Sequence, residues 1–452
     1  MDLRTDTALC TDLYELTMAA AYFRRRMFGP ATFSLFIREY PPNRGFLVSA
    51  GLEDVVDYLE RFRYSQTDLE YLDSLRLFPQ DFLRYLEGMR FTGDMVALQE
   101  GRLFFRDEPI LEVTAPIIEA QVVETFILNA VNLQTSIATK AARCVHAAQG
   151  RRLVDFSLRR THGPEAGLKV ARASFLAGFH GTSNVLAGKR YGIPVAGTMA
   201  HSFVTSFEDE TEAFRAFAEA FPGNTVLLID TYDTVAGARK AAVVGREMAA
   251  RGESLRGVRL DSGDMAALSR EVRGILREAG LDGASIFASG GFDEGKIARA
   301  LAAGGEIDAF GVGTKMGVSA DAPYTDIAYK LVQYDGRPVL KLSTGKKTLA
   351  GAKQVFRAAE RGALRGDTIA LRGEELPGEA LLRTVMRGGQ RLGPPDALTD
   401  VRERFREEFS RLPEPHKRLE APAELPVHLS AALRESQEKV IHDVREKELG
   451  ES

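Results

Sequence analysis

The sequence has little cysteine, no long apolar run and no excess of either charge. Only Cys10 and Cys144 occur among 452 residues, too few for a disulfide framework or a four-cysteine zinc site and typical of the reducing cytoplasm. Apolar runs stay below the roughly 18 residues of a membrane span. The first residues, MDLRTDTALCTD, carry charges where an export signal would be apolar. We therefore expect a cytoplasmic protein that does not bind membranes.

The charges are also nearly balanced. Lysine and arginine number 59 and aspartate and glutamate 63, which leaves a net charge of −4. No overall field favours nucleic acid as a partner, so local groups must hold any anionic ligand. With 44% hydrophobic and 27% charged residues the chain can build a sizeable core. At roughly 150 residues per domain, two or three domains are expected.

Three segments differ in their patterning. The patterning of residues 1–115 predicts a domain of mixed α/β structure. For residues 116–335 we expect an α/β domain, because from about residue 150 short apolar strands alternate with amphipathic helices. Such alternation indicates parallel strands, in a barrel or an open sheet. Residues 336–452 predict a hairpin, short strands and charged helices that return to pack against the N-terminal segment.

Each predicted strand of the middle segment ends in polar or glycine-rich sequence. The ends are Asp155–Arg160, Thr198–His201, Asp230–Asp233, Asp261–Asp264, Ser289–Gly291 and Gly311–Lys315. In (β/α) barrels the carboxyl ends of the strands build the active site. The pattern therefore predicts one ring of functional groups.

Two kinds of strand end have a specific chemistry. Asp261 and Asp264, in VRLDSGDM, suit a ribose diol or a hydrated Mg²⁺, although Asp264 is equally explained as a helix cap. The turns in FASGGF and FGVGTKMG expose backbone amides to an anion such as phosphate. GVGTKMG does not match the dinucleotide-binding fingerprint, because its third glycine is misplaced, and STGKKT lacks the leading glycine of a P-loop.

His201, in GTMAHSFV, is the candidate nucleophile or base. A histidine near an apolar strand is often only packed, but this one falls inside the predicted ring. Asp230 or Asp233 could accept a hydrogen bond from one ring nitrogen, which would orient the imidazole for catalysis. Arg159 or Arg160 could hold a phosphate, with the other a surface charge.

Together these stretches resemble nicotinate phosphoribosyltransferases, a type II phosphoribosyltransferase family. The resemblance rests on TDLYELTMAAAYF, RGFLVSAGLEDVVDYL, DFSLRRTHGPEAG, GTSNVLAGKRYGIPVAGTMAHSFVTSF, LLIDTYDT, VRLDSGD and GVGTKMGVSADAPYTDIAYKLV. It implies an incomplete (β/α) barrel and a smaller mixed α+β domain built from both chain ends. It also implies the joining of nicotinate to phosphoribosyl pyrophosphate, an entry step to NAD, coupled to ATP hydrolysis.

The resemblance assigns catalytic roles. His201 would be the residue phosphorylated by ATP, with Asp230 aligning it. Asp261 would serve the ribose hydroxyls and, indirectly, Mg²⁺, with Asp264 as a second carboxylate.

Binding roles follow in the same way. Tyr14 and Phe156 would sandwich the base, and Tyr14 would come from the other subunit of a homodimer. Arg259 would grip the carboxylate of the base, and Arg159 would lie near the ribose phosphates. The 5′-phosphate would be held by Gly290, Gly291, Gly313 and Thr314.

Ser183, in GTSNV, bears on the choice of base. Nicotinamide-specific relatives have an aspartate here, which would repel the carboxylate of nicotinate, so serine favours nicotinate. The alternatives are a nicotinamide phosphoribosyltransferase, a quinolinate phosphoribosyltransferase, which needs no phosphohistidine, and a barrel that binds phosphosugars without turnover. A cysteine cluster that binds zinc in some relatives is missing here.

Overall fold

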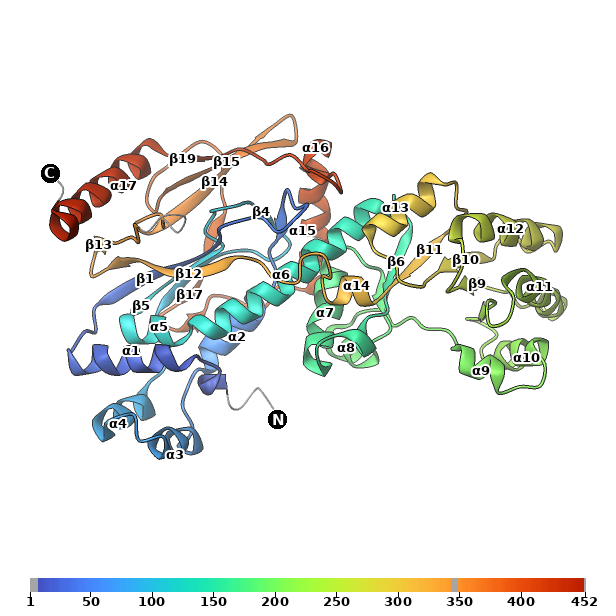
Figure 1. Ribbon diagram of the computed structural model, residues 1–452, viewed down its shortest axis with the longest axis horizontal. Helices are drawn as coiled ribbons and strands as arrows, with labels where there is room; N and C mark the ends of the chain where they lie inside the picture. Colours follow the sequence, from blue (N-terminus) through green and yellow to red (C-terminus); the bar gives the residue numbers. More distant parts are fainter. Residues whose placement is uncertain (1–6, 343–347, 451–452) are drawn as a thin grey trace. The chain divides into compact units, whose positions relative to one another are not determined.

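A computed structural model describes residues 7–342 and 348–450. The chain forms two compact units, one of residues 1–136 with 324–452 and one of residues 137–323 (Figure 1). The sequence placed the boundaries at 115 and 335. The structure has no break at the first, because β5 (Leu111–Pro116) runs directly into α5 (Ile117–Val122). Near the second, β12 (Ile327–Tyr334) pairs with β1 (Pro30–Ile37) and so belongs to the first unit.

The first unit is built around an antiparallel seven-stranded sheet in the order β13-β12-β1-β5-β3-β17-β18. Its remaining strands are β3 (Asp94–Leu98), β13 (Arg337–Pro338), β17 (Leu382–Arg387) and β18 (Gln390–Arg391). Strands from both ends of the sequence therefore share one sheet. Its core includes Phe33 and Tyr329, whose rings stack at 4.9 Å.

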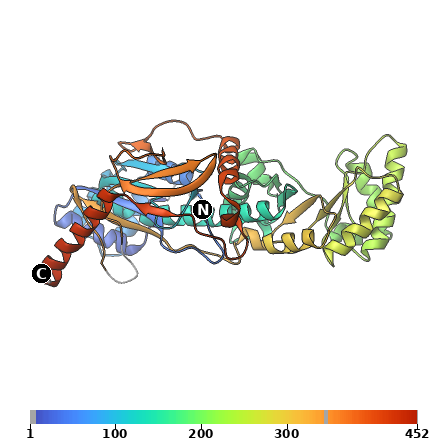
Figure 2. The ribbon, with the colours of Figure 1, turned by 90° about the horizontal axis from the view of Figure 1, so that it is seen from above.

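Smaller sheets and helices complete this unit. The strands are β2 (Leu47–Val48) with β4 (Leu103–Phe104), and β14 (Lys353–Glu360), β15 (Ala363–Leu371), β16 (Glu379–Ala380) and β19 (Val427–Leu429). The helices are α1 (Leu13–Arg24), α2 (Leu52–Arg61), α3 (Gln66–Ser74), α4 (Gln80–Gly88), α15 (Leu398–Arg411), α16 (Glu414–Lys417) and α17 (Ala431–Val444). The C-terminal helix α17 packs against β15 (Figure 2). The helix α6 (Glu124–Ala147) continues into the second unit.

The second unit contains a parallel six-stranded sheet in the order β7-β6-β11-β10-β9-β8. The strands are β6 (Arg152–Asp155), β7 (Gly181–Thr182), β8 (Val226–Leu228), β9 (Gly257–Leu260), β10 (Ser285–Ala288) and β11 (Ala309–Val312). β11, the last of these strands in the sequence, pairs with β6, the first. Val195 extends the sheet beyond β7 by a parallel bridge to Thr182. Within the described residues the sheet is open, with Val195 at one edge and β8 at the other.

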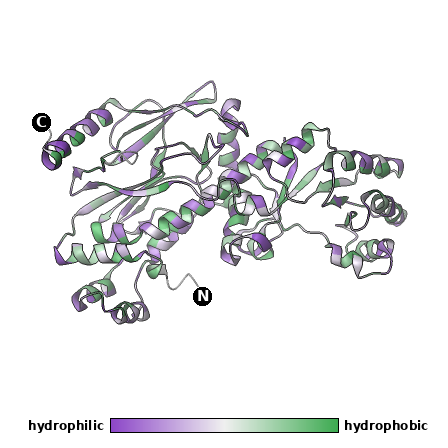
Figure 3. Cartoon of the chain, viewed as in Figure 1, coloured by the Kyte–Doolittle hydropathy of each residue, from purple (hydrophilic) through white to green (hydrophobic). Residues whose placement is uncertain are grey.

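Helices connect these strands, as the alternating sequence pattern predicts. They are α7 (Pro164–Leu176), α8 (Val185–Tyr191), α9 (His201–Thr205), α10 (Glu210–Ala220), α11 (Thr234–Ala250), α12 (Met265–Glu278), α13 (Glu294–Ala302) and α14 (Thr314–Gly317). In α12 the side chains of Met265, Val272 and Leu276 are buried. Figure 3 shows hydrophilic and hydrophobic residues mixed along these helices, as expected of helices with one face on a sheet. No helix among the described residues is long and apolar enough to span a bilayer.

Candidate functional site

His201 is the first residue of α9 and faces two neighbouring strand ends. Its Nδ1 lies 3.2 Å from the hydroxyl oxygen of Thr231, the third residue after β8. Its Nε2 lies 4.0 Å from Oδ2 of Asp261, after β9. The imidazole is about half exposed, so a ligand can reach it. The structure thus brings His201 and Asp261 together, as the sequence predicts.

The Asp230 carboxylate contacts other groups than the sequence predicts. The sequence predicts a hydrogen bond from His201 to Asp230 or Asp233. Instead, Oδ2 of Asp230 accepts from the backbone N–H of Asp261 at 3.0 Å and from the Ser262 hydroxyl at 2.6 Å. Asp233 caps α11 by accepting from the Ala236 N–H. Thr231 therefore takes the place next to Nδ1, and Asp230 holds the turn that carries Asp261.

Arg259, on β9, joins three strand-end segments. Its Nε donates to the Ser289 hydroxyl at 2.8 Å, and its Nη2 donates to Oδ1 of Asp261 at 2.9 Å. Its Nη1 donates to the Thr198 hydroxyl at 3.2 Å and to the Met199 carbonyl at 3.3 Å. Four of the five N–H groups of a guanidinium are thus engaged. Within the described residues the second N–H of Nη2 has no acceptor.

The Asp261 carboxyl is held in its charged form by these neighbours. Burial acts to raise its pKa, but the hydrogen bonds from Ser289 and Arg259 and the Arg259 charge outweigh burial. The pKa therefore lies below its ordinary value. The carboxylate is ionised at neutral pH and can accept hydrogen bonds from hydroxyl groups.

Both predicted anion-binding turns lie at the same edge of the sheet. Gly290 and Gly291 follow β10 with φ of 97° and 67°, where glycine is favoured. A Cβ at Gly290 would lie 1.9 Å from the carbonyl oxygen of Asp261, so only glycine fits there. Gly313 follows β11, and Thr314 starts the short helix α14.

Two lysines close to these turns were not singled out from the sequence. Lys296 donates to the carbonyl oxygen of Gly290. Lys315 donates to Asp293 at 2.7 Å. Each lysine follows its glycine turn by six residues or fewer. A lysine so close to a predicted anion-binding turn is a signal that the sequence already contained.

Phe156 lies at the end of β6 and is tightly packed. The Arg259 guanidinium carbon lies 5.4 Å from the ring centre, and Phe287 lies 5.5 Å away. A Cβ at Gly311 would come within 2.7 Å of the ring, so this glycine makes room for it. Asp155, buried before it, accepts hydrogen bonds from Ser157 and Thr182.

The remaining predicted residues are less closely linked to this cluster. The N–H of Ser183 donates to the carbonyl of Asp155 at 2.8 Å. Arg159 is exposed in a short 3-10 helix, Leu158–Arg160, that follows Phe156. Asp264 caps α12, accepting from the N–H groups of Ala266 and Ala267 at 3.1 Å, which supports the capping explanation. Tyr14 belongs to the other unit, where α1 leaves it 46% exposed.

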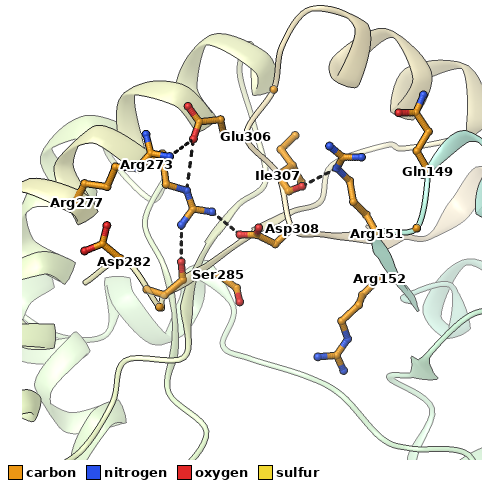
Figure 4. Close-up of a pocket in the computed structure, with 14 residues that line it drawn as sticks. Gln149, Arg151, Arg152, Arg273, Arg277, Asp282, Ser285, Glu306, Ile307 and Asp308 are labelled. Atoms are coloured by element: carbon orange, nitrogen blue, oxygen red, sulfur yellow. Dashed lines mark hydrogen bonds and ion pairs between the residues drawn. The ribbon is translucent and has the colours of Figure 1, made fainter. Parts of the chain in front are cut away.

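A hollow of about 830 Å³ lies at the opposite, amino edge of the sheet (Figure 4). The loops before β6, β10 and β11 and the helix α12 line it with charged side chains, several of which pair with one another. Arg273 contacts Asp308, and Arg277 contacts Glu306 at 2.9 Å. The hollow shares no residue with the strand ends that carry His201 and Asp261.

Comparison with known proteins agrees with this arrangement. Residues 9–132, 151–365 and 378–437 match the N-terminal domain, the family and the C-terminal domain models of nicotinate phosphoribosyltransferase (NAPRTase). The chain is 51% identical over 414 residues to the nicotinate phosphoribosyltransferase pncB2 of Mycobacterium tuberculosis, covering 91% of this chain and 89% of that one. It is 38% identical over 471 residues to the nicotinate phosphoribosyltransferase of Bacillus subtilis, covering 97% and 96%.

Solved structures show the same likeness. Human nicotinic acid phosphoribosyltransferase superposes with a TM-score of 0.85 at 31% identity, covering 95% of this chain and 99% of that one. A nicotinate-nucleotide pyrophosphorylase from Pyrococcus furiosus gives 0.75 at 26% identity, covering 90% and 95%. The chain belongs to the nicotinate phosphoribosyltransferase family.

Proposed function

We propose that this protein transfers the phosphoribosyl group of phosphoribosyl pyrophosphate to nicotinate, with coupled hydrolysis of ATP. The pyridine nitrogen forms a bond to C1′ of the ribose, and the bond from C1′ to the pyrophosphate oxygen breaks. The observation that carries the proposal is the cluster of His201, Arg259 and Asp261 beside two glycine turns, in a member of this family.

Positioning and electrostatics would carry the transfer, because the reaction passes through an oxocarbenium-like state. Oδ2 of Asp261 would accept hydrogen bonds from the ribose hydroxyls, since in the described part of the chain Arg259 and Ser289 both bind Oδ1 and no donor binds Oδ2. The turns at Gly290 and Gly313 would receive the 5′-phosphate. The remaining Nη2 N–H of Arg259 would donate to the nicotinate carboxylate, with Phe156 below the ring.

The contacts of His201 suit a phosphorylated residue. With the proton on Nδ1, that nitrogen donates to Thr231, and Nε2 presents its lone pair on the side of Asp261. Nε2 would attack the γ-phosphorus of ATP, forming the N–P bond as ADP leaves. Hydrolysis of this bond after transfer would regenerate the imidazole.

The carboxylates of Asp230 and Asp261 would fit a hydrated Mg²⁺ that the phosphates of the substrates carry. Oδ1 of Asp230 is buried and has no hydrogen-bond partner in the described part of the chain. Within the same residues no three acidic, histidine or cysteine side chains gather as a metal site. Mg²⁺ commonly takes one or two carboxylates together with phosphate oxygens and water. Bound there, it would neutralise charge on the pyrophosphate group.

A homodimer is part of the proposal. Helix α1 exposes Leu13, Tyr14 and Met18, at 52%, 46% and 36%. An apolar stripe of this kind favours burial against another surface. In the dimer, Tyr14 of the partner subunit would complete the sandwich around the base.

The proposed function is tested by assaying turnover of nicotinate, nicotinamide and quinolinate in parallel, with and without ATP. We expect nicotinate mononucleotide and pyrophosphate from nicotinate, at a higher rate with ATP. Preference for nicotinamide would contradict the role given to Ser183. Turnover of quinolinate with release of CO₂ would identify the alternative reaction.

Ser183→Asp is expected to weaken the preference for nicotinate. A carboxylate at this position repels that of nicotinate and accepts hydrogen bonds from the amide of nicotinamide. The ratio of kcat/KM for nicotinate to that for nicotinamide should fall about thirtyfold, or roughly 2 kcal/mol. Ser285→Asp, which adds the same charge at the opposite edge of the sheet, should leave the ratio unchanged. An unchanged ratio in Ser183→Asp would remove this residue from base selection.

A further inference from the structure

Ser289 lies at the centre of the cluster, although neither its sequence motif nor the proposed chemistry gives it a role. It follows β10 directly and is only 2% exposed. Its backbone N–H donates to the carbonyl of Leu260 at 2.7 Å, so the turn after β10 is tied to the end of β9. This bond places the Ser289 side chain between Arg259 and Asp261.

The hydroxyl group of Ser289 bridges these two charged residues. Its oxygen accepts from Nε of Arg259 at 2.8 Å. Its single hydrogen can go to Oδ1 of Asp261 or to the Leu260 carbonyl, which is 3.3 Å away. The carboxylate is the closer and the charged acceptor, and hydrogen bonds to charged groups are the stronger ones.

The bridge decides which oxygen of Asp261 is available to a ligand. Both Ser289 and Nη2 of Arg259 donate to Oδ1. Oδ2 is left pointing to the side where Nε2 of His201 lies, 4.0 Å away. With Oδ1 bound twice, rotation of the carboxylate away from this orientation breaks two charge-assisted hydrogen bonds.

We infer that Ser289 is a positioning residue for the phosphoribosyl substrate: its hydroxyl holds Asp261 so that Oδ2 faces the ribose. The inference rests on the proposed function. Ser289 touches no substrate atom and acts through Asp261. Arg259 depends on it less, because three of its four hydrogen bonds go to Thr198, Met199 and Asp261. Loss of the hydroxyl should therefore affect the phosphoribosyl donor more than nicotinate.

The test compares Ser289→Ala with Ser269→Ala in the full-length protein. Ser269 is a matched control: it is fully buried in α12, donates to the Ala266 carbonyl at 3.1 Å and accepts from the Glu306 N–H at 3.0 Å. Both variants lose a buried hydroxyl, so their melting temperatures should fall by similar amounts. We expect Ser289→Ala to raise the KM for phosphoribosyl pyrophosphate about tenfold, with the KM for nicotinate within about twofold of wild type. Ser269→Ala should change neither KM.

A KM for phosphoribosyl pyrophosphate within twofold of wild type in Ser289→Ala would overturn the inference, as would equal rises in both KM values. Should Ser289→Ala fail to fold, Ser289→Cys decides, because a thiol of similar size is a weaker donor. Its KM for phosphoribosyl pyrophosphate should exceed that of wild type, and an unchanged value would overturn the inference. Failure of the proposed function would instead show as no product from the wild-type protein.

Discussion

Replacing His201 with alanine should abolish the stimulation of turnover by ATP while leaving a slow, ATP-independent transfer. The imidazole is the only group proposed to accept the γ-phosphate, and loss of a positioned catalytic group commonly costs about 10² or more in rate. The groups proposed to bind the other substrates, Arg259, Asp261 and the glycine turns, stay in place. The rate with ATP should therefore fall to the rate without it.

Two measurements check this expectation. Initial rates are compared with and without ATP, and transfer of label from γ-labelled ATP to the protein is followed. The described residues give the His201 side chain one hydrogen bond, to Thr231, so its loss should cost about 1 kcal/mol of stability. His428→Ala, at an exposed position on β19 in the other unit, is the control and should keep both ATP stimulation and labelling. Labelled protein or full ATP stimulation in His201→Ala would mean that another residue is the nucleophile.

The sequence was most informative where one local rule determines the structure. Strand-helix alternation predicted the parallel sheet of the second unit, because an amphipathic helix must cover one face of it. The strand-end rule then placed His201, Asp261 and the glycine turns at one edge, whereas Arg259 was assigned through the family resemblance. The positive φ of Gly290 and its contact with the Asp261 carbonyl explain why glycine is required there.

Prediction was weaker where the direction of a side chain matters. Asp230 and Thr231 are adjacent in sequence, but one turns to the next strand end and the other to His201. Motifs assign such residues to a site without saying which atom contacts which. The bridge made by Ser289 was missed for the same reason, although Ser289 was among the strand-end residues. The unit boundaries depend on the pairing of β12 with β1, which lie about 290 residues apart, and no local pattern indicates such a pairing.

Arg259→Lys is expected to give the largest loss in the transfer reaction itself. Lysine keeps the positive charge but has one nitrogen in place of three, so it cannot reach Ser289, Thr198 and Asp261 together. The ends of β9 and β10 and the segment before His201 would lose their common donor. We expect kcat/KM for nicotinate to fall by about 10² to 10³, or roughly 3 to 4 kcal/mol, the loss typical of removing one preorganised donor.

The same variant separates two roles of this arginine. If Arg259 only gripped the carboxylate of the base, the loss would appear in the KM for nicotinate alone. Because its Nη2 also holds Oδ1 of Asp261, we expect the KM for phosphoribosyl pyrophosphate to rise as well. The control is Arg215→Lys, which disrupts an equally planar contact, with Nε and Nη2 at 2.8 Å and 2.7 Å from Glu247, on an exposed surface. That variant should stay within about twofold of wild type, since exposed ion pairs contribute little. Wild-type kinetics in Arg259→Lys would show that charge alone suffices, and the network around Arg259 would then have no part in catalysis.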